Sequence, residues 1–181
     1  MDASGKPYHH GDLRRALLEA AVDAVADRGA AALSLRDLAR RAGVSHAAPT
    51  HHFGDKAGLL TAVAVEGFAR LGAALAEATD FAEASVAYVL FATDHPGYFA
   101  VMFRPELYHR DDPALVAARD RATAMLRSGA QRAFGEDDRL PALAAWSLVH
   151  GMATLIIDGA LELDPGTDIA SLARAAALRL R

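Results

Sequence analysis

The chain has 181 residues, of which 52% are hydrophobic and 23% are charged. This length and apolar content are sufficient for a sizeable core, with one compact domain and a small appended one, and they exclude a disordered chain. There is no cysteine, which excludes a disulfide framework, a thiolate nucleophile and a thiolate zinc site. The formal net charge of −4 argues against a strong overall attraction to nucleic acid.

Targeting and membrane signals are weak. No segment has the charged start, apolar core and cleavage site of a signal peptide. The most apolar run, Leu140 to Ile157, contains Trp146, Ser147 and His150 and is shorter than a typical bilayer span. We therefore expect a cytoplasmic protein that does not enter a membrane.

Two helical segments open the chain after a polar arm of residues 1–8. Apolar residues recur at helical spacing from about Gly11 to Arg28, and Gly29 can end that helix. Ser34 is placed to cap a second, short helix that ends at Gly43, because glycine enters the left-handed conformation cheaply.

Two more helices follow this turn. Val44 can fill the corner between helices, and Ser45 is placed to cap a short helix that runs to about Phe53. Asp55 can cap a much longer helix over Lys56–Ala78. The spacing of residues 34–60 is therefore typical of a helix-turn-helix.

This stretch resembles the DNA-binding domain of the TetR/AcrR family of transcriptional regulators. The residues that fit the family pattern are Ala39, Ala42, Gly43, Val44, Ser45, His52, Phe53 and Lys56. The resemblance implies an all-α fold with a three-helix DNA-binding head (residues 1–57) and a ligand-binding and dimerisation body (residues 58–181). The sequence departs from the pattern at Thr50, where the family commonly has tyrosine, and at Pro49 inside the recognition helix.

The predicted DNA contacts lie on and around the recognition helix. Up to residue 60 the chain has eight cations against seven acids, a net of +1, which leaves −5 for the remainder, so phosphate binding depends on local arrangement. We predict base-edge contacts for His46, Ala47, Thr50 and His51, and phosphate contacts for Ser34, Ser45, His52 and Lys56. Arg36 joins this set, with a solvated-face role as its alternative. A metal site formed by these histidines with Asp55, or by His9 and His10, is less favoured.

The remainder of the chain shows helical patterns and no convincing strand. The helix that begins at Pro141 is apolar on most sides, which predicts that it is largely buried. The last helix shows one apolar stripe, and with the Pro141 helix it is the expected four-helix interface of a homodimer. The expected segments are a helix over Phe81–Asp94, a stop near His95-Pro96-Gly97, an irregular helix over Tyr98–Tyr108 broken by Pro105, a helix from Asp112-Pro113 to Phe134, a charged loop over Gly135–Arg139, and a stripe of Ile169, Leu172, Ala173, Ala176 and Leu180.

Trp146-Ser-Leu-Val-His-Gly151 resembles the Trp-x-x-x-His-Gly signature of a C-terminal effector domain attached to TetR-type heads. The functional interpretation places an uncharged or weakly polar, partly aromatic effector in the body. The more favoured alternative is that His150 is a hydrogen-bonded core or interface residue and that Gly151 lets a helix approach. The predicted ligand-binding residues are Tyr88, Phe91, Tyr98, Met102, Phe103, Trp146 and His150.

The resemblance implies a repressor that a small hydrophobic effector releases from a palindromic operator. No nucleophile motif or recognisable carboxylate pair is present, so we expect no enzyme activity, no cofactor and no metal. The alternatives are a helical protein-interaction module without DNA binding and a small-molecule-binding protein.

Overall fold

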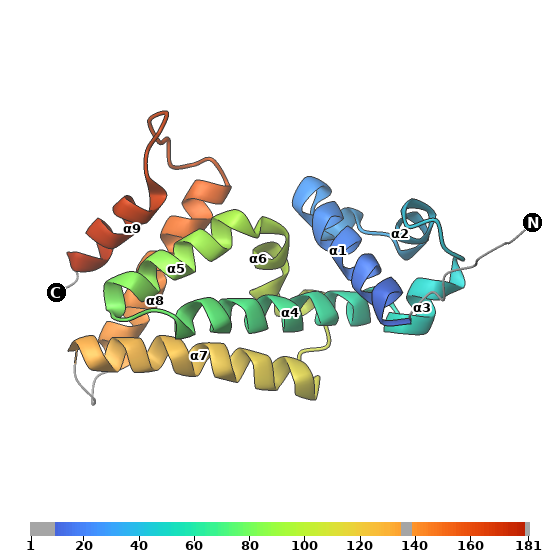
Figure 1. The fold of residues 1–181 in the computed structure, drawn as a ribbon, viewed down its shortest axis with the longest axis horizontal. Helices are drawn as coiled ribbons and strands as arrows, with labels where there is room; N and C mark the ends of the chain where they lie inside the picture. The colour runs from blue at the N-terminus through green and yellow to red at the C-terminus, as the bar shows by residue number, and fades with distance from the viewer. Residues whose placement is uncertain (1–9, 135–138, 180–181) are drawn as a thin grey trace, which may run out of the picture.

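The structure, a computed structural model, describes residues 10–134 and 139–179. Within those residues all regular structure is helical, which confirms the predicted all-α fold (Figure 1). The predicted arm of residues 1–8, His9, the interior of the loop at 135–138 and Leu180 lie outside the described residues. The elements are α1 (His10–Arg28), η1 (Ala30–Ala32), α2 (Leu35–Arg41), α3 (Ala47–Phe53), α4 (Lys56–Ala76), α5 (Phe81–Asp94), α6 (Pro96–Met102), η2 (Pro105–Leu107), α7 (Pro113–Phe134), α8 (Arg139–Ile157) and α9 (Ile169–Leu178).

The long helix α4 joins the head to the body. Helices α1 and α3 contact its first half, α2 packs on α1 and α3, and α4 runs beside α7 toward its other end (Figure 1). Its inner face is buried, from Leu60 to Leu75. One contiguous apolar core extends from Leu17 in α1 to Ala173 in α9. The head and the body therefore share a core through α4.

Local capping signals explain several helix starts. The Asp55 side chain accepts a hydrogen bond from the backbone N–H of Gly58 at 2.7 Å, and Asp112 does the same for Ala114 at 2.9 Å. A carboxylate at this position satisfies an N–H that the helix leaves unpaired. Gly43 has φ +65°, which confirms the predicted left-handed turn between α2 and α3.

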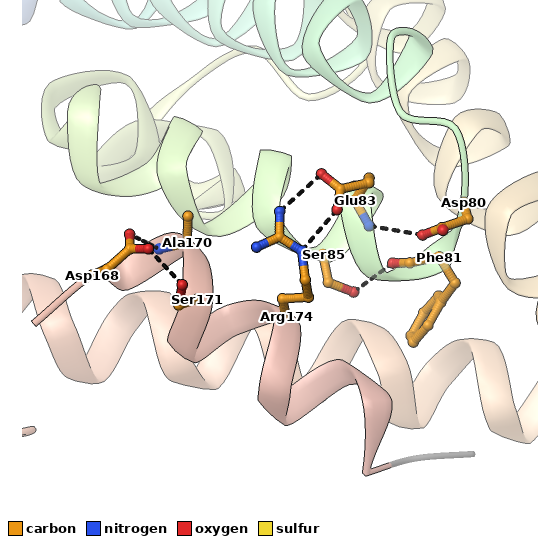
Figure 2. A network of polar contacts seen from close by, with 8 residues as sticks. All are labelled: Asp80, Phe81, Glu83, Ser85, Asp168, Ala170, Ser171 and Arg174. Atoms are coloured by element: carbon orange, nitrogen blue, oxygen red, sulfur yellow. Dashed lines mark hydrogen bonds and ion pairs between the residues drawn. The ribbon is translucent and has the colours of Figure 1, made fainter.

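Helix α9 is fastened to α5 by ionic contacts (Figure 2). The Arg174 guanidinium donates two hydrogen bonds to the Glu83 carboxylate, at 2.8 and 3.1 Å. This contact lowers the pKa of Glu83. Asp168 caps α9 by accepting from the N–H of Ala170 at 3.1 Å. The Glu83–Arg174 pair therefore links α5 to α9, and the Asp168 cap stabilises the start of α9.

Both predicted serine caps in the head are wrong in detail. Ser34 holds the N-cap position of α2 in an extended conformation, but its side chain makes no capping hydrogen bond. Before α3 the N-cap position belongs to His46, which is already helical at φ −59° and ψ −24°. The carbonyl of Ser45 accepts from the N–H of Ala48 at 3.0 Å. The chain thus starts to turn at Ser45, and the helix needs no serine side chain there.

The predicted helix over Phe81–Asp94 and its stop near His95-Pro96-Gly97 are confirmed, because α5 ends at Asp94 and His95 is its C-cap. The next helix begins two residues before the predicted start at Tyr98, since Pro96 is the first residue of α6; α6 ends at Met102, and Pro105 begins the separate turn η2. Proline is tolerated at the first helical position because its missing N–H would have no intrahelical partner there. Proline therefore begins both elements, and the predicted interruption of the 98–108 segment lies at residues 103–104, just before Pro105.

Helix α8 is much more exposed than predicted. The exposed fractions of Leu140, Leu143 and Leu155 are 70%, 53% and 48%. By length and composition alone, α4 and residues 140–157 could each cross a membrane, but half of that α4 segment is buried in the protein and only 17% of residues 140–157 is. Within the part of the chain that the structure describes, no other segment covers the outer face of α8.

Candidate nucleic-acid interface

The recognition helix α3 presents one polar face to solvent. His46, Ala47, Thr50 and His51 are all exposed, at the i, i+1, i+4 and i+5 spacing that puts residues on one side of a helix. Pro49 is buried on the opposite side. Its missing N–H falls in the first turn, where no intrahelical partner exists, and α3 continues to Phe53. All four predicted base-contact residues are therefore accessible.

The predicted phosphate-contact residues surround α3 at helix ends. Ser34, Arg36 and Ser45 are exposed, and His52 and Lys56 are half-buried. The Lys56 ammonium donates a hydrogen bond to the backbone carbonyl of Ala31 at 2.9 Å. A lysine ammonium has three donors, so this bond orients Lys56 and leaves two donors for an anion.

Gly58 determines how closely α4 approaches the end of α3. A Cβ atom at Gly58 would lie 2.0 Å from the backbone carbonyl oxygen of Phe53, closer than any side chain allows. Gly58 was not singled out in the sequence because its partner belongs to another helix. This contact sets the orientation of the recognition helix relative to α4.

A loop of the body also reaches the start of α4. The backbone N–H of His109 donates to the Thr61 hydroxyl at 3.0 Å, and His109 Nε2 lies 3.4 Å from Asp55 Oδ1. The hydrogen bond from Gly58 and the nearby His109 lower the pKa of Asp55. The corner between α3 and α4 is thus stabilised by the Asp55 cap on Gly58 and by the contacts of His109 with Asp55 and Thr61.

The histidines of the head do not gather into a metal site. Among residues 10–134 and 139–179, no group of three or more histidine, aspartate or glutamate side chains could hold a metal ion. The rings of His51 and His52 pack edge to face, with centroids 5.5 Å apart. The other metal pair considered, His9 and His10, includes a residue outside the described part of the chain.

A hydrogen-bonded aromatic cluster lies in the body. The Tyr88 hydroxyl lies 2.9 Å from His150 Nδ1 and accepts from the indole N–H of Trp146 at 3.2 Å. The ring centroids of Phe103 and Phe99 are 4.7 and 5.2 Å from that of His150. Burial raises the pKa of Tyr88 and lowers the pKa of His150. The structure therefore brings Tyr88, Phe103, Trp146 and His150 together, and Phe99 is a member that was not predicted from the sequence.

The other predicted ligand residues lie apart from this cluster. Phe91 packs on His95, with ring centroids 5.3 Å apart. Tyr98 lies under the Arg70 guanidinium at 5.1 Å. The Met102 side chain packs against Gly67, where an added Cβ would lie 2.6 Å from the Met102 sulfur. Tyr98 and Met102 therefore face α4.

Two hollows lie near these residues. A cavity beside Trp146, lined also by Ser85, Ala145 and Val149, has a volume of about 20 Å³, which is room for about one water molecule. A groove of about 270 Å³ runs along Tyr98 between α1, α4 and the α5–α6 junction. The space beside Trp146 is thus too small for an organic ligand in this conformation.

A helix-turn-helix head with an accessible recognition helix, carried by one long helix into a helical body, defines a DNA-binding transcriptional regulator. Residues 17–63 match the family model described as bacterial regulatory proteins, tetR family. Residues 81–180 match the model described as tetracyclin repressor-like, C-terminal domain. The chain belongs to the TetR family, which is a family of regulators and not an enzyme class.

Individual relatives are similar to the head in sequence or to the whole chain in fold. The HTH-type transcriptional repressor Rv3405c of Mycobacterium tuberculosis is 42% identical over 62 residues, which are 34% of this chain and only about a third (33%) of that relative. A protein of unknown function from Rhodococcus sp. RHA1 is 36% identical, covers 97% of both chains and has a TM-score of 0.78. The regulator PfmR from Thermus thermophilus shares the fold, with a TM-score of 0.69 at 23% identity over 91% of this chain and 96% of its own.

Proposed function

We propose that this chain is a cytoplasmic transcriptional repressor that binds a palindromic operator as a homodimer and is released by a small hydrophobic effector. The head (1–57) binds DNA, and the body (58–181) dimerises and binds the effector. The observation that carries the proposal is the exposed face of α3, where His46, Ala47, Thr50 and His51 stand together. Such a helix fits the major groove, where base edges are distinguishable.

Loss of a base contact and loss of a phosphate contact are expected to change DNA binding in different ways. His51→Ala is expected to relax the base preference at one or two positions at a cost of about 1–3 kcal/mol. Lys56→Ala is expected to weaken binding to all sequences and to reduce the salt slope by about one. Selection from a randomised duplex pool, followed by titration at several salt concentrations, separates the two. An unchanged preference after His51→Ala contradicts the assignment.

A second copy of the chain is the proposed cover for α8 and α9. One recognition helix reads only a few base pairs, so a two-fold dimer is needed to contact two half-sites, separated by about 34 Å or a related spacing. Leu140, Leu143 and Leu155 of α8 and Leu178 of α9 are exposed large apolar side chains that such a contact would bury.

Light scattering of the chain at micromolar concentration tests the dimer. Leu143→Glu is expected to give a monomer, whereas Met125→Glu on α7, also an exposed apolar position (40%), is the matched control. A stable wild-type monomer contradicts the dimer. A dimer that binds no duplex of any sequence favours the alternative of a protein-interaction module.

The proposed effector site is the cluster of Tyr88, Phe103, Trp146 and His150, and with it we propose that the body is of the Trp-x-x-x-His-Gly subtype. Helix α6 supports a coupling role, because Phe99 contacts His150 while Tyr98 and Met102 face α4. An effector that enlarges the small cavity beside Trp146 shifts α6 or α8, and α4 transmits the shift to the head. Nearly complete release requires about 5.5 kcal/mol of differential affinity.

Trp146 is the only tryptophan, so its fluorescence reports on the cluster directly. Hydrophobic metabolites are screened for a change in this fluorescence, and each hit is tested for release of the selected duplex. A compound that binds at Trp146 and leaves DNA affinity unchanged has no coupling to the head. If no compound binds, His150 has the alternative role of a hydrogen-bonded core residue.

A further inference from the structure

In the described part of the head, four of the seven lysine and arginine side chains pair with a carboxylate or a carbonyl. Arg15, Arg28 and Arg40 form ion pairs with Glu19, Asp27 and Asp37 at 2.9, 3.5 and 3.3 Å. Lys56 donates to a backbone carbonyl. In the described part of the head, the arginines without a carboxylate partner are Arg14, Arg36 and Arg41.

Arg14 is the member of this group that is held against the recognition helix. Its guanidinium carbon lies 5.2 Å from the centroid of the Phe53 ring, and Phe53 is the last residue of α3. The N-terminal end of α1, which carries Arg14, lies beside α3 (Figure 1). A cation–π contact positions a guanidinium without neutralising its charge. The end of α3 therefore carries a fixed, exposed positive charge contributed by another helix.

We propose that Arg14 binds a backbone phosphate of the DNA beside the recognition helix. The proposal rests on DNA binding by the head and adds a contact from α1. Phosphate contacts set the register of a recognition helix on the duplex, and the planar guanidinium fork matches phosphate geometry. Of the three arginines without a carboxylate partner, Arg14 is the one that an observed contact places against α3.

Consecutive arginines on α1 supply a matched experiment. Arg14→Met keeps an unbranched side chain on Phe53 and removes the charge, and Arg14→Lys keeps the charge. Arg15→Met removes the neighbouring charge, which is already paired with Glu19. Affinity is measured at several salt concentrations for two duplexes, one selected from a randomised pool and one of mixed sequence without that site.

We expect Arg14→Met to weaken binding to both duplexes by a similar factor of about ten, the loss of one charge-assisted hydrogen bond. The slope of log K against log salt falls by about 0.9 for each protomer bound, because each protomer loses one phosphate contact. Arg14→Lys keeps the slope, and Arg15→Met changes it less than Arg14→Met does. Thermal unfolding checks that each variant is folded.

An unchanged salt slope in Arg14→Met overturns the proposal. Weaker binding to the selected duplex alone, with the slope intact, also overturns it, because Arg14 then acts only by packing on Phe53. If the wild-type chain binds neither duplex, the proposed function itself fails, and the phosphate contact fails with it.

Discussion

Replacing Gly97 with alanine tests whether α6 of the body is pressed against α1 of the head. A Cβ atom at Gly97 would lie 2.3 Å from the backbone oxygen of Val22, 2.9 Å from its Cγ1 and 3.1 Å from its carbonyl carbon. The nearest of these atoms belongs to the backbone of α1, so no rotamer change relieves the contact and the two helices must separate. Overpacking of this kind costs about 1–3 kcal/mol.

The alanine also improves helix propensity by up to about 1 kcal/mol, which offsets part of that cost. We expect a net loss of about 1–2 kcal/mol in the free energy of unfolding, or roughly 2–8 °C in Tm for a chain of this size. Thermal and urea unfolding measure it. Gly72→Ala is the control, because its nearest neighbour is the Ala122 Cα at 3.7 Å, an ordinary contact, and it is expected to stabilise by about 0.5–1 kcal/mol. If Gly97→Ala unfolds at or above the wild-type temperature while the control behaves as expected, the close α1–α6 contact does not exist in solution.

Three other contacts can be tested by single substitutions or by pH. Gly58→Ala places a Cβ against the Phe53 carbonyl, so we expect a lower Tm and weaker duplex binding; normal values for both contradict the tight α3–α4 corner. Tyr88→Phe removes the partner of Trp146 and His150, so we expect a loss of roughly 1–2 kcal/mol in urea unfolding and a changed Trp146 emission; an unchanged spectrum argues against the indole hydrogen bond. Burial holds the pKa of His150 below its ordinary 6.5, so the stability from neutral His150 is complete above pH 6.5 and is lost as the pH falls. Urea midpoints at about pH 7.5 and about pH 5.5 should show this decrease and His150→Gln should reduce it, whereas greater wild-type stability at the lower pH contradicts it.

Local signals in the sequence were sufficient for most of the helices. The carboxylate caps at Asp55 and Asp112 and the left-handed Gly43 act within a few residues of their own position, so their neighbours in the chain reveal them. The exposed residues of α3 were likewise predicted from helical spacing after a recognisable turn. The serine caps failed because a backbone turn can start a helix without a side-chain acceptor.

Contacts between distant segments were not predictable in this way. Tyr88 and His150 are 62 residues apart in sequence, and nothing local to Tyr88 specifies a histidine partner. Arg14 resembles Arg15 in the sequence, yet one lies on Phe53 and the other pairs with Glu19. Whether Arg14 or Arg15 is held against Phe53 depends on how α1 packs against α3. Local sequence patterns do not predict that packing.

The prediction that the helix from Pro141 (α8) is largely buried was wrong for a different reason. Ala145, Val149 and Ala153 are buried within the chain at a spacing of four, whereas the larger Leu143 and Leu155 are exposed. The apolar pattern of α8 predicts that most of its sides are buried. It does not show whether the same chain or a second chain buries them. Gly151 illustrates the difference: a Cβ there would meet no atom within 4 Å, so no helix of the same chain requires a glycine at this position. The close approach suggested for Gly151 is therefore available only to a helix from outside, as the proposed dimer supplies, and the apolar residues that made α8 look like a core helix are the ones that such a partner would bury.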